Sequence, residues 1–313
     1  MTTSEAEQEP LEVVLERLER IYGDELSRRD HARLKRKGNS GDPNKQQPTL
    51  ASSSTATDLS ATSSTTNGTF TPSSDISRSS SESLPEYDDP DTSMLPILVA
   101  VCLVQHNEPS DFARLFGYFA HSSKHSSTIL LSKLVLRLRT ALFKAVPLVG
   151  VPRIINALSA LHQAVKEHPR GQEVFNDLPL ESTKPTKTTE EDSAAGWAFF
   201  KAIYAQHAEK IIERIGETSP DLAEMIVDEL YGANLSRTEV LSWKETVLLE
   251  FTGCASLACA AQAKGHFFGC KNLGVSRQSV EQAIEVLREI GRWIGQPLDE
   301  DKMPFLSGLD KFP

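Results

Sequence analysis

Three of the four cysteines in this 313-residue chain lie beside a histidine, in the stretch 254–270. Cys254, Cys259 and Cys270 could act as thiolate nucleophiles or redox groups, and His266 could transfer a proton near neutral pH. On one continuous helix, Cys259 and His266 would be about 10 Å apart along the axis, so His266 would not activate Cys259 directly. His266 and Cys270 are four residues apart and would be neighbours on one helix face.

Three interpretations of this group stay open at the level of sequence. In the first, the cysteines are small buried hydrophobes and His266 is a hydrogen-bonded core residue. In the second, His266 transfers a proton together with a carboxylate. In the third, Cys259 or Cys270 reacts as a thiol, and Cys254 or another subunit resolves the product. Zinc binding is disfavoured, because these cysteine spacings on one continuous helix do not converge on a tetrahedral centre.

The elements that must position these residues are helices, because apolar side chains recur at helical spacing with hardly any strand signal. The predicted helices cover residues 94–106, 112–122, 127–146, 152–167, 193–216, 220–231, 244–268 and 276–290. Pro152, Ser219 and Gly274 with Ser276 mark helix ends. The sequence therefore predicts an all-α fold, with Cys259 and His266 on one long helix.

An ordered series of short motifs between about residues 128 and 290 resembles the carboxymuconolactone decarboxylase and alkylhydroperoxidase D-like (AhpD-like) superfamily. The motifs of the first half are Gly150-Val151-Pro152-Arg153 and Asn156-Ala157. Those of the second half are Gly196 with Phe200 and Tyr204, Ser219-Pro220-Asp221-Leu222, Tyr231-Gly232, Trp243-Lys244-Glu245, His266, and Asn272 with Gly274. The resemblance implies an AhpD-like fold of two related helical halves, assembled as trimers or hexamers.

The resemblance also implies where a site should lie. In AhpD-like enzymes a helix carries Cys-x-x-Cys, with a histidine four residues after the second cysteine and a glutamate on the same long helix. Cys259 stands at the first cysteine position and His266 at the histidine, whereas Gln262 replaces the second cysteine. Glu245 is the best match for the glutamate, with Glu250 as the alternative.

Gln262 removes the dithiol with which such enzymes reduce peroxides, since an amide can neither attack a peroxide nor resolve a sulfenic acid. The resemblance thus implies either a peroxidase-type oxidoreductase or a His-dependent proton-transfer enzyme acting on a small molecule. His266, Glu245 and Cys259 are its expected catalytic residues, with Cys270 and Gln262 as further members. The alternative is a non-catalytic homo-oligomeric scaffold or interaction protein with a degenerate site. No cofactor or metal is expected, because the sequence has no phosphate-binding glycine loop.

The composition changes sharply along the chain and predicts four parts. Residues 1–37 are predicted to form an amphipathic helix, and residues 38–93 a disordered segment in which 20 of the 35 residues from 51 to 85 are serine or threonine. Residues 94–300 are predicted to form the helical domain, and residues 301–313 a tail. The Ser/Thr-rich segment 38–93 is predicted to be disordered because it cannot bury enough apolar surface to offset the entropy lost on ordering its backbone.

The net charge of −10 and a pI of about 5.4 argue against a general nucleic-acid surface. Four cysteines in a chain of this length do not indicate a disulfide framework, and the first residues lack the pattern of a secretion signal. No apolar run is long enough for a membrane span. The chain ends in Lys311-Phe312-Pro313, which is not a peroxisomal address of the Ser-Lys-Leu type. The expected location is intracellular and cytoplasmic, with an organelle left open.

Overall fold

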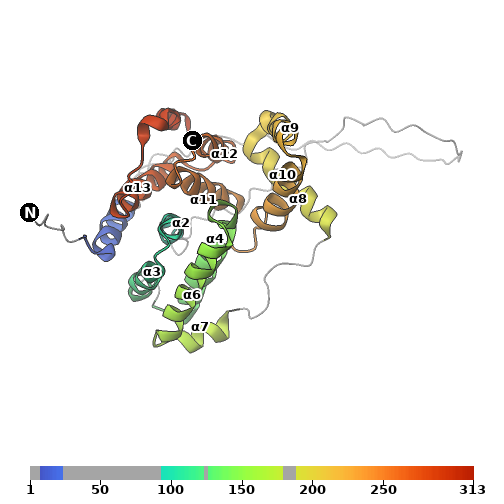
Figure 1. The fold of residues 1–313 in the computed structure, drawn as a ribbon. Coiled ribbons are helices and arrows are strands. Elements are labelled where there is room, and N and C mark those ends of the chain that lie inside the picture. Colours follow the sequence, from blue (N-terminus) through green and yellow to red (C-terminus); the bar gives the residue numbers. More distant parts are fainter. Residues whose placement is uncertain (1–7, 24–92, 123–125, 179–187) are drawn as a thin grey trace, which may run out of the picture. The chain divides into compact units, whose positions relative to one another are not determined.

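The computed structural model describes residues 8–23, 93–122, 126–178 and 188–313. These residues form α-helices, a π-helix and short 3₁₀ segments, with no strand among them, so the predicted all-α class is confirmed (Figure 1). Most of the segment predicted to be disordered, residues 38–93, lies outside the described residues. No helix in the described part of the chain is long and apolar enough to cross a membrane.

The elements follow one another in two groups along the chain. Residues 11–23 form an N-terminal helix, and the first group continues with α2 (Leu95–His106), α3 (Pro109–His121), α4 (Thr128–Lys144), α5 (Val146–Val149), α6 (Val151–Glu167) and α7 (Gly171–Asp177). The second group contains α8 (Thr189–Tyr204), η3 (Ala205–His207), α9 (Ala208–Thr218), α10 (Pro220–Glu224), η4 (Met225–Leu235), α11 (Trp243–Ser256), α12 (Ala260–Asn272), α13 (Arg277–Trp293), η5 (Glu300–Lys302) and η6 (Pro304–Lys311).

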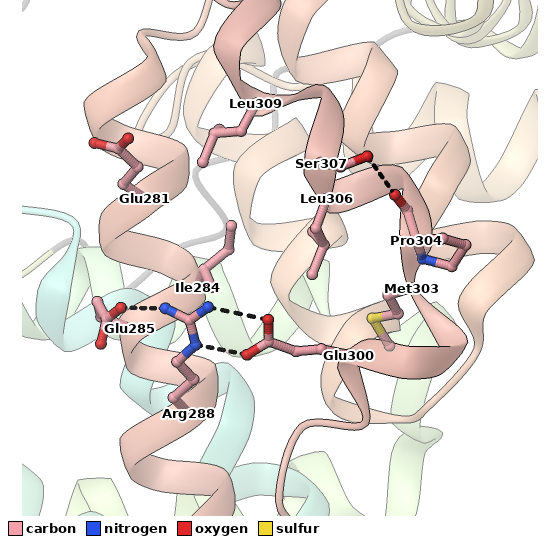
Figure 2. Close-up of a pocket in the computed structure, with 10 residues that line it drawn as sticks. All are labelled: Glu281, Ile284, Glu285, Arg288, Glu300, Met303, Pro304, Leu306, Ser307 and Leu309. Carbon is pink, nitrogen blue, oxygen red and sulfur yellow. Dashed lines mark hydrogen bonds and ion pairs between the residues drawn. The ribbon is translucent and has the colours of Figure 1, made fainter.

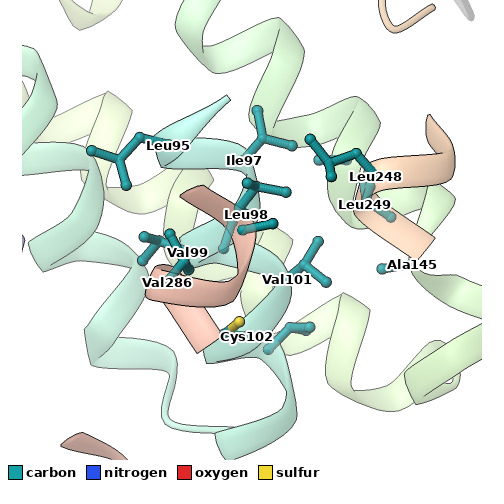
Figure 3. Close-up of a cluster of buried hydrophobic side chains, with 14 of the residues drawn as sticks. Leu95, Ile97, Leu98, Val99, Val101, Cys102, Ala145, Leu248, Leu249 and Val286 are labelled. Atoms are coloured by element: carbon teal, nitrogen blue, oxygen red, sulfur yellow. The ribbon is translucent and has the colours of Figure 1, made fainter. Parts of the chain in front are cut away.

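Helix α2 lies at the centre of the core. All of its residues from Leu95 to Gln105 are buried, because α3, α4, α6, α11 and α13 pack around it. Figure 3 shows Leu98, Val99 and Val101 of α2 in one cluster of buried side chains with Val286 of α13 and Leu248 of α11. An apolar stretch of this length is too short for a bilayer and is satisfied here by burial on every side.

Serine and threonine side chains begin the main helices. Ser127 accepts a hydrogen bond from the backbone N–H of Leu130 at the start of α4, and Ser276 does the same for Ser279 in α13. Ser242 caps α11 as part of a capping box whose other member is Glu245. These caps satisfy N–H groups that have no partner inside the helix, which explains why the helices begin at these residues.

Two glycines let α8 and η4 pack closely against each other. A Cβ atom added at Gly196 would lie 2.1 Å from the carbonyl oxygen of Val227, and one added at Gly232 would lie 2.4 Å from that of Asp192. Any larger residue would push the two helices apart. This approach places the aromatic side chains at the end of α8 against η4.

Three predicted helices differ from the observed ones. The single helix expected over 244–268 is divided at Leu257–Cys259 into α11 and α12, and Ala258 has a φ of 56° there. The helix expected over 193–216 is divided at Ala205, whose φ is 48°. The helix expected over 220–231 is a short α10 followed by the π-helix η4. The first two breaks occur at alanines with a positive φ, a role that sequence patterns associate with glycine.

The N-terminal helix and the C-terminal residues both pack on the helical domain. The described residues 8–23 belong to the same compact unit as the described residues from 93 onward. Leu11, Leu15 and Leu18 of the N-terminal helix are fully buried. At the other end of the chain, Met303 and Phe312 are buried as well, although residues 301–313 were predicted to be a tail.

Candidate functional site

Helices α11 and α12 form an antiparallel hairpin, and helical spacing places Glu250 and His266 at one level of it. A Cβ atom added at Gly269 would lie 3.1 Å from Val247, so these two positions face each other. Glu250 is three residues after Val247, and His266 is three residues before Gly269, so both lie at the next level on the same helix faces. Both side chains are buried, with exposures of 2% and 5%.

One polar atom of each of these side chains has no hydrogen-bond partner within the described residues. These atoms are Oε1 of Glu250 and Nδ1 of His266. Buried polar groups are almost always paired, because an unpaired one costs about 1–3 kcal/mol. Two such atoms at one level of one hairpin therefore point to a site that a substrate or a water molecule would complete.

Two tyrosines border this pair. The ring of Tyr204, at the end of α8, lies 6.0 Å from the ring of His266 between centroids. Its hydroxyl is 3.2 Å from that of Tyr231 in η4. A Cβ atom at Gly265 would lie 2.9 Å from the Tyr204 ring, so a glycine in α12 allows the ring to lie across this helix. Tyr204 is only partly buried and forms the edge of the group nearest to solvent.

Burial shifts the pKa values of Glu250 and His266 in opposite directions. It raises the pKa of Glu250 to about 8, although the positive charge of Lys144 opposes the shift. It lowers the pKa of His266 to about 4. At neutral pH the carboxyl group is therefore mostly protonated and the imidazole is neutral. A protonated carboxyl can donate a proton while a neutral imidazole accepts one, which is a pair suited to acid–base chemistry.

Lys144 is the nearby cation, and it also holds the end of η4. Its ammonium group is 1% exposed and donates to the carbonyl oxygens of Leu235 and Arg237 at 2.7 and 2.8 Å, and to that of Asn234 at 3.4 Å. Burial lowers the pKa of Lys144 to about 8. The group therefore stays mostly charged at neutral pH, where it counters the helix dipole.

The two tyrosines and Cys254 belong to the same electrostatic group. Burial raises the pKa of Tyr204 to about 12, and it raises that of Tyr231 further. Burial also raises the pKa of the Cys254 thiol, and the charges of Glu250 and Cys259 add to this effect. Cys254 lies one helical turn after Glu250 in α11, next to the carboxyl group. Because its pKa is raised, Cys254 is a thiol rather than a thiolate at neutral pH.

The structure separates several residues that the sequence grouped with His266. Glu245 accepts hydrogen bonds from Ser242 as part of the α11 cap, and forms an ion pair with Arg137 at 2.9 Å. Cys259 is exposed at the N-cap of α12, and Gln262 is exposed on the first turn. Cys270 is fully buried, and burial raises the pKa of its thiol. Glu250, the alternative to Glu245, is the carboxylate that helical spacing places at the level of His266.

Lys144 and Tyr231 are members of the group whose roles the sequence did not reveal. Lys144 stands at the end of an apolar helix, where a cation also suits the dipole of its own helix, so nothing in its surroundings marks it as buried. Glu250 has a clearer signal, since it is the one charged residue in the apolar run Val247-Leu248-Leu249-Glu250-Phe251. Charged residues are rarely buried without a partner, so a glutamate within a buried apolar segment is a candidate functional residue.

A separate pocket of about 400 Å³ lies between α13 and the C-terminal 3₁₀ segments (Figure 2). Ile284, Met303, Leu306 and Leu309 form its apolar wall. Arg288 crosses it, donating to Glu300 at 2.8 and 3.1 Å and to Glu285. Arg288, Glu285 and Glu300 are thus paired with one another, and Glu281 pairs with Arg277 outside the pocket. The pocket shares no lining residue with the group around Glu250 and His266. The described residues also contain no cluster of three or more metal-binding side chains.

Comparison with known proteins yields two distant relatives. The chain is 28% identical over 159 residues to Peroxisomal protein 2 of Schizosaccharomyces pombe, covering 51% of this chain and 70% of that protein. It is 26% identical over 184 residues to Peroxisomal protein 2 of Saccharomyces cerevisiae, covering 54% of this chain and 65% of that protein. No family model and no solved structure matches the chain. The chain is thus similar, over about half its length, to two yeast proteins named for the peroxisome.

Proposed function

We propose that the chain is a proton-transfer enzyme in which His266 is the general base and Glu250 the general acid. One observation carries this proposal: Glu250 and His266 are buried in the same α11–α12 hairpin, at one level by helical spacing, and each has a buried polar atom that lacks a partner among the described residues. Their pKa values of about 4 and about 8 leave each group in the form that its role requires near neutral pH.

The chemistry that suits this pair is the movement of a proton on a small carbonyl acid or lactone. Neutral His266 would take a proton from the carbon next to the carbonyl group, and protonated Glu250 would donate one to the oxygen. Because both groups are neutral, the protein does not have to bury a net charge between α11 and α12 before the substrate binds. Tyr204, at the partly exposed edge, is the residue past which such a substrate would enter.

We further propose the carboxymuconolactone decarboxylase and AhpD-like fold for this chain, with assembly into a homo-oligomer. The ordered motifs of the sequence and the all-α architecture support this assignment. The apolar side chains of Ile129, Val151 and Ile155 are 62%, 55% and 56% exposed, and an interface between copies would cover them. Sedimentation analysis tests the assembly, since a monomer would contradict it.

One observation favours a second candidate function, a non-catalytic scaffold. His266 is 5% exposed, which is what a packed interior requires and less than a substrate site usually shows. The scaffold and the enzyme make different predictions for the same two variants, so one experiment decides between them.

Turnover by the full-length chain should be measured on a panel of lactones, carbonyl acids and alkyl hydroperoxides, with solvent deuterium exchange followed by NMR. For the proton-transfer enzyme we expect Glu250→Gln and His266→Asn each to lower the rate about 10²–10⁴-fold. Glu213→Gln, at an exposed position in α9, is the matched control and should keep the full rate. A folded wild-type chain that turns over nothing in the panel would support the scaffold instead.

The names of the two yeast relatives lead us to propose that this chain also resides in peroxisomes. A fluorescent protein fused to the N-terminus, which leaves Lys311-Phe312-Pro313 free, would test this location by co-localisation with a peroxisomal marker. Diffuse fluorescence throughout the cytosol would contradict it.

A further inference from the structure

The turn between α11 and α12 joins Cys254 to Cys259 through the backbone. The N–H of Cys259 donates to the carbonyl oxygen of Cys254 at 2.9 Å, and the N–H of Ala258 donates to that of Ala255 at 3.0 Å. Ala258 has a φ of 56° between them. These two bonds and one left-handed residue define a Schellman motif, which commonly ends an α-helix.

A Schellman motif brings together the side chains of its first and last residues, which here are both cysteines. The thiol of Cys259 donates to the carbonyl oxygen of Leu257 at 3.7 Å, so its sulfur lies over the turn rather than away from it. The two thiols are also close enough that ionisation of Cys259 raises the pKa of Cys254. Backbone and side-chain observations thus agree that the two cysteine side chains lie at the same turn.

The two cysteines differ in their access to solvent. Cys259 is exposed, whereas Cys254 is 3% exposed and is held as a thiol by its surroundings. Cys102 and Cys270 are buried on other helices, and burial raises the pKa of the Cys102 thiol. Of the four cysteines, Cys259 is therefore the one that a molecule in solution can reach, and Cys254 is the sulfur that the turn holds beside it.

We propose that Cys254 and Cys259 are a redox-active dithiol, which closes to an intramolecular disulfide after an alkyl hydroperoxide oxidises Cys259. In the first step the Cys259 sulfur attacks the peroxide, the O–O bond breaks, and Cys259 sulfenic acid and an alcohol form. In the second step the Cys254 sulfur displaces the hydroxyl group, which leaves as water with the Cys254 proton. A small dithiol would restore the reduced pair by thiol–disulfide exchange.

The pair lies outside the Cys-x-x-Cys pattern, since five residues separate its members and a helix ends between them. This explains how a chain with Gln262 at the second position of that pattern could still hold two thiols together. The proposal does not depend on proton transfer by Glu250 and His266, because neither residue takes part in the two steps.

The test uses the reduced full-length chain and tert-butyl hydroperoxide. After oxidation, the chain is denatured, alkylated with iodoacetamide and digested with trypsin. Cleavage after Lys244 and Lys264 places Cys254 and Cys259 in one peptide, residues 245–264, whereas Cys270 falls in the next, residues 265–271. We expect the first peptide to carry no alkyl group and to be lighter than the unalkylated reduced peptide by two hydrogen atoms, and the second to keep its alkyl group. A dithiol added before alkylation should restore both labels.

Two variants separate the steps. Cys259→Ser is at an exposed position that does not endanger folding, and it should leave Cys254 fully alkylated after oxidation. Cys254→Ala should leave Cys259 as a sulfenic acid that dimedone labels. Two intact alkyl groups on the peptide after oxidation, or bonds from Cys259 only to other chains or to Cys270, would overturn the proposal.

Discussion

Glu250, His266 and Lys144 are ionisable residues in an interior made mostly of apolar side chains. A buried group keeps its charge only when partners replace the lost water, and the three residues differ in this respect. Lys144 has three carbonyl oxygens around it, whereas Glu250 and His266 each have an atom with no partner among the described residues. The lysine is therefore a structural cation, and the other two are neutral groups available for chemistry.

Glu250 predicts a fall in stability as the pH rises above about 6.5. Its folded pKa of about 8 exceeds the ordinary value of 4.5, so the folded state holds a proton that the unfolded state has released. Its contribution to the free energy of unfolding is complete below pH 4.5 and is lost as the pH rises to about 8. His266, with a folded pKa of about 4 against 6.5, contributes in the opposite direction between those two values. The two effects oppose each other until about pH 6.5, above which Glu250 acts alone.

Urea unfolding between pH 6.5 and 8 measures this effect, with a slope of up to about 1.4 kcal/mol per pH unit. Glu250→Gln keeps the shape of the side chain and cannot ionise, so the fall should disappear in this variant. Glu213→Gln should retain it. The titration of Lys144 falls above this range, between its folded pKa of about 8 and the ordinary 10.5. Equal slopes in wild type and Glu250→Gln would refute the assignment.

Lys144→Met is expected to destabilise the chain by about 3 kcal/mol. The substitution keeps the length of the side chain but leaves the carbonyl oxygens at the end of η4 without their buried donor. Lys133→Met is a matched control, because Lys133 is exposed on the same helix and should change stability by less than about 0.5 kcal/mol. Chemical denaturation of both variants measures the two changes in the free energy of unfolding. Equal changes would show that the three hydrogen bonds of Lys144 to carbonyl oxygens do not stabilise the fold.

At the scale of elements, the sequence predicted most helices but not the breaks that shape the site. The caps Ser219 and Ser276 could be predicted because a serine directly before an apolar run is typical of a helix start. Gly274, with a φ of 70°, marks an end in the same way. Ala258 gave no such signal, since alanine is the best helix former and its left-handed conformation depends on the surrounding packing. The break it makes is the reason why Cys259 is not on the same helix as Cys254.

The site could be predicted only in part for a related reason. His266 was found by its residue type and its place in a motif. The choice between Glu245 and Glu250 required the third dimension, because both are carboxylates on the same helix. The spacing of Ser242 and Glu245 does fit a capping box, and this local role accounts for Glu245 without any catalytic function.

Ala258→Gly is expected to stabilise the chain by about 0.5–1 kcal/mol. A glycine adopts the left-handed conformation without the strain that a Cβ atom causes, and the exposed alanine loses little packing. The same change at Ala261, an exposed position within α12, should destabilise by about 1 kcal/mol. Thermal unfolding of the two variants tests the signs, and a loss of stability at position 258 would contradict the turn geometry.

At the scale of the whole molecule, the N-terminal helix packs on the helical domain, although residues 24–92 lie between the two in the sequence. Its amphipathic pattern predicted a buried face but not the surface that buries it, which is formed by α3 and α13. Arg114 binds Glu12 at 2.7 and 3.0 Å, the hydroxyl of Tyr118 donates to Glu19 at 2.9 Å, and Arg17 pairs with Glu289. These contacts fix the orientation of a helix that apolar burial alone would hold less specifically.

A protease site inserted between Ser54 and Thr55 should cut the chain without releasing the N-terminal piece. Burial of Leu11, Leu15 and Leu18 and the ion pairs should keep the two pieces together during size-exclusion chromatography. Leu15→Asp places a charge in this interface, and we expect the cut piece to elute separately in that variant. Val13→Asp, at a position that is 39% exposed, should have no such effect. Separation of the pieces from the unmutated chain would contradict the docking.

The intrinsic fluorescence of Trp293 should report whether the N-terminal helix is bound. Its indole N–H donates to the carbonyl oxygen of Glu9 at 2.7 Å, and the guanidinium of Arg114 lies 5.7 Å from the centre of its ring. The ring of His106 is 6.1 Å away on the same indole. When the N-terminal helix leaves, the indole loses its acceptor and gains water, and Arg114 loses Glu12. The emission of Trp293 should shift to the red at that moment, so the chain contains its own fluorescent reporter of whether its first helix is bound.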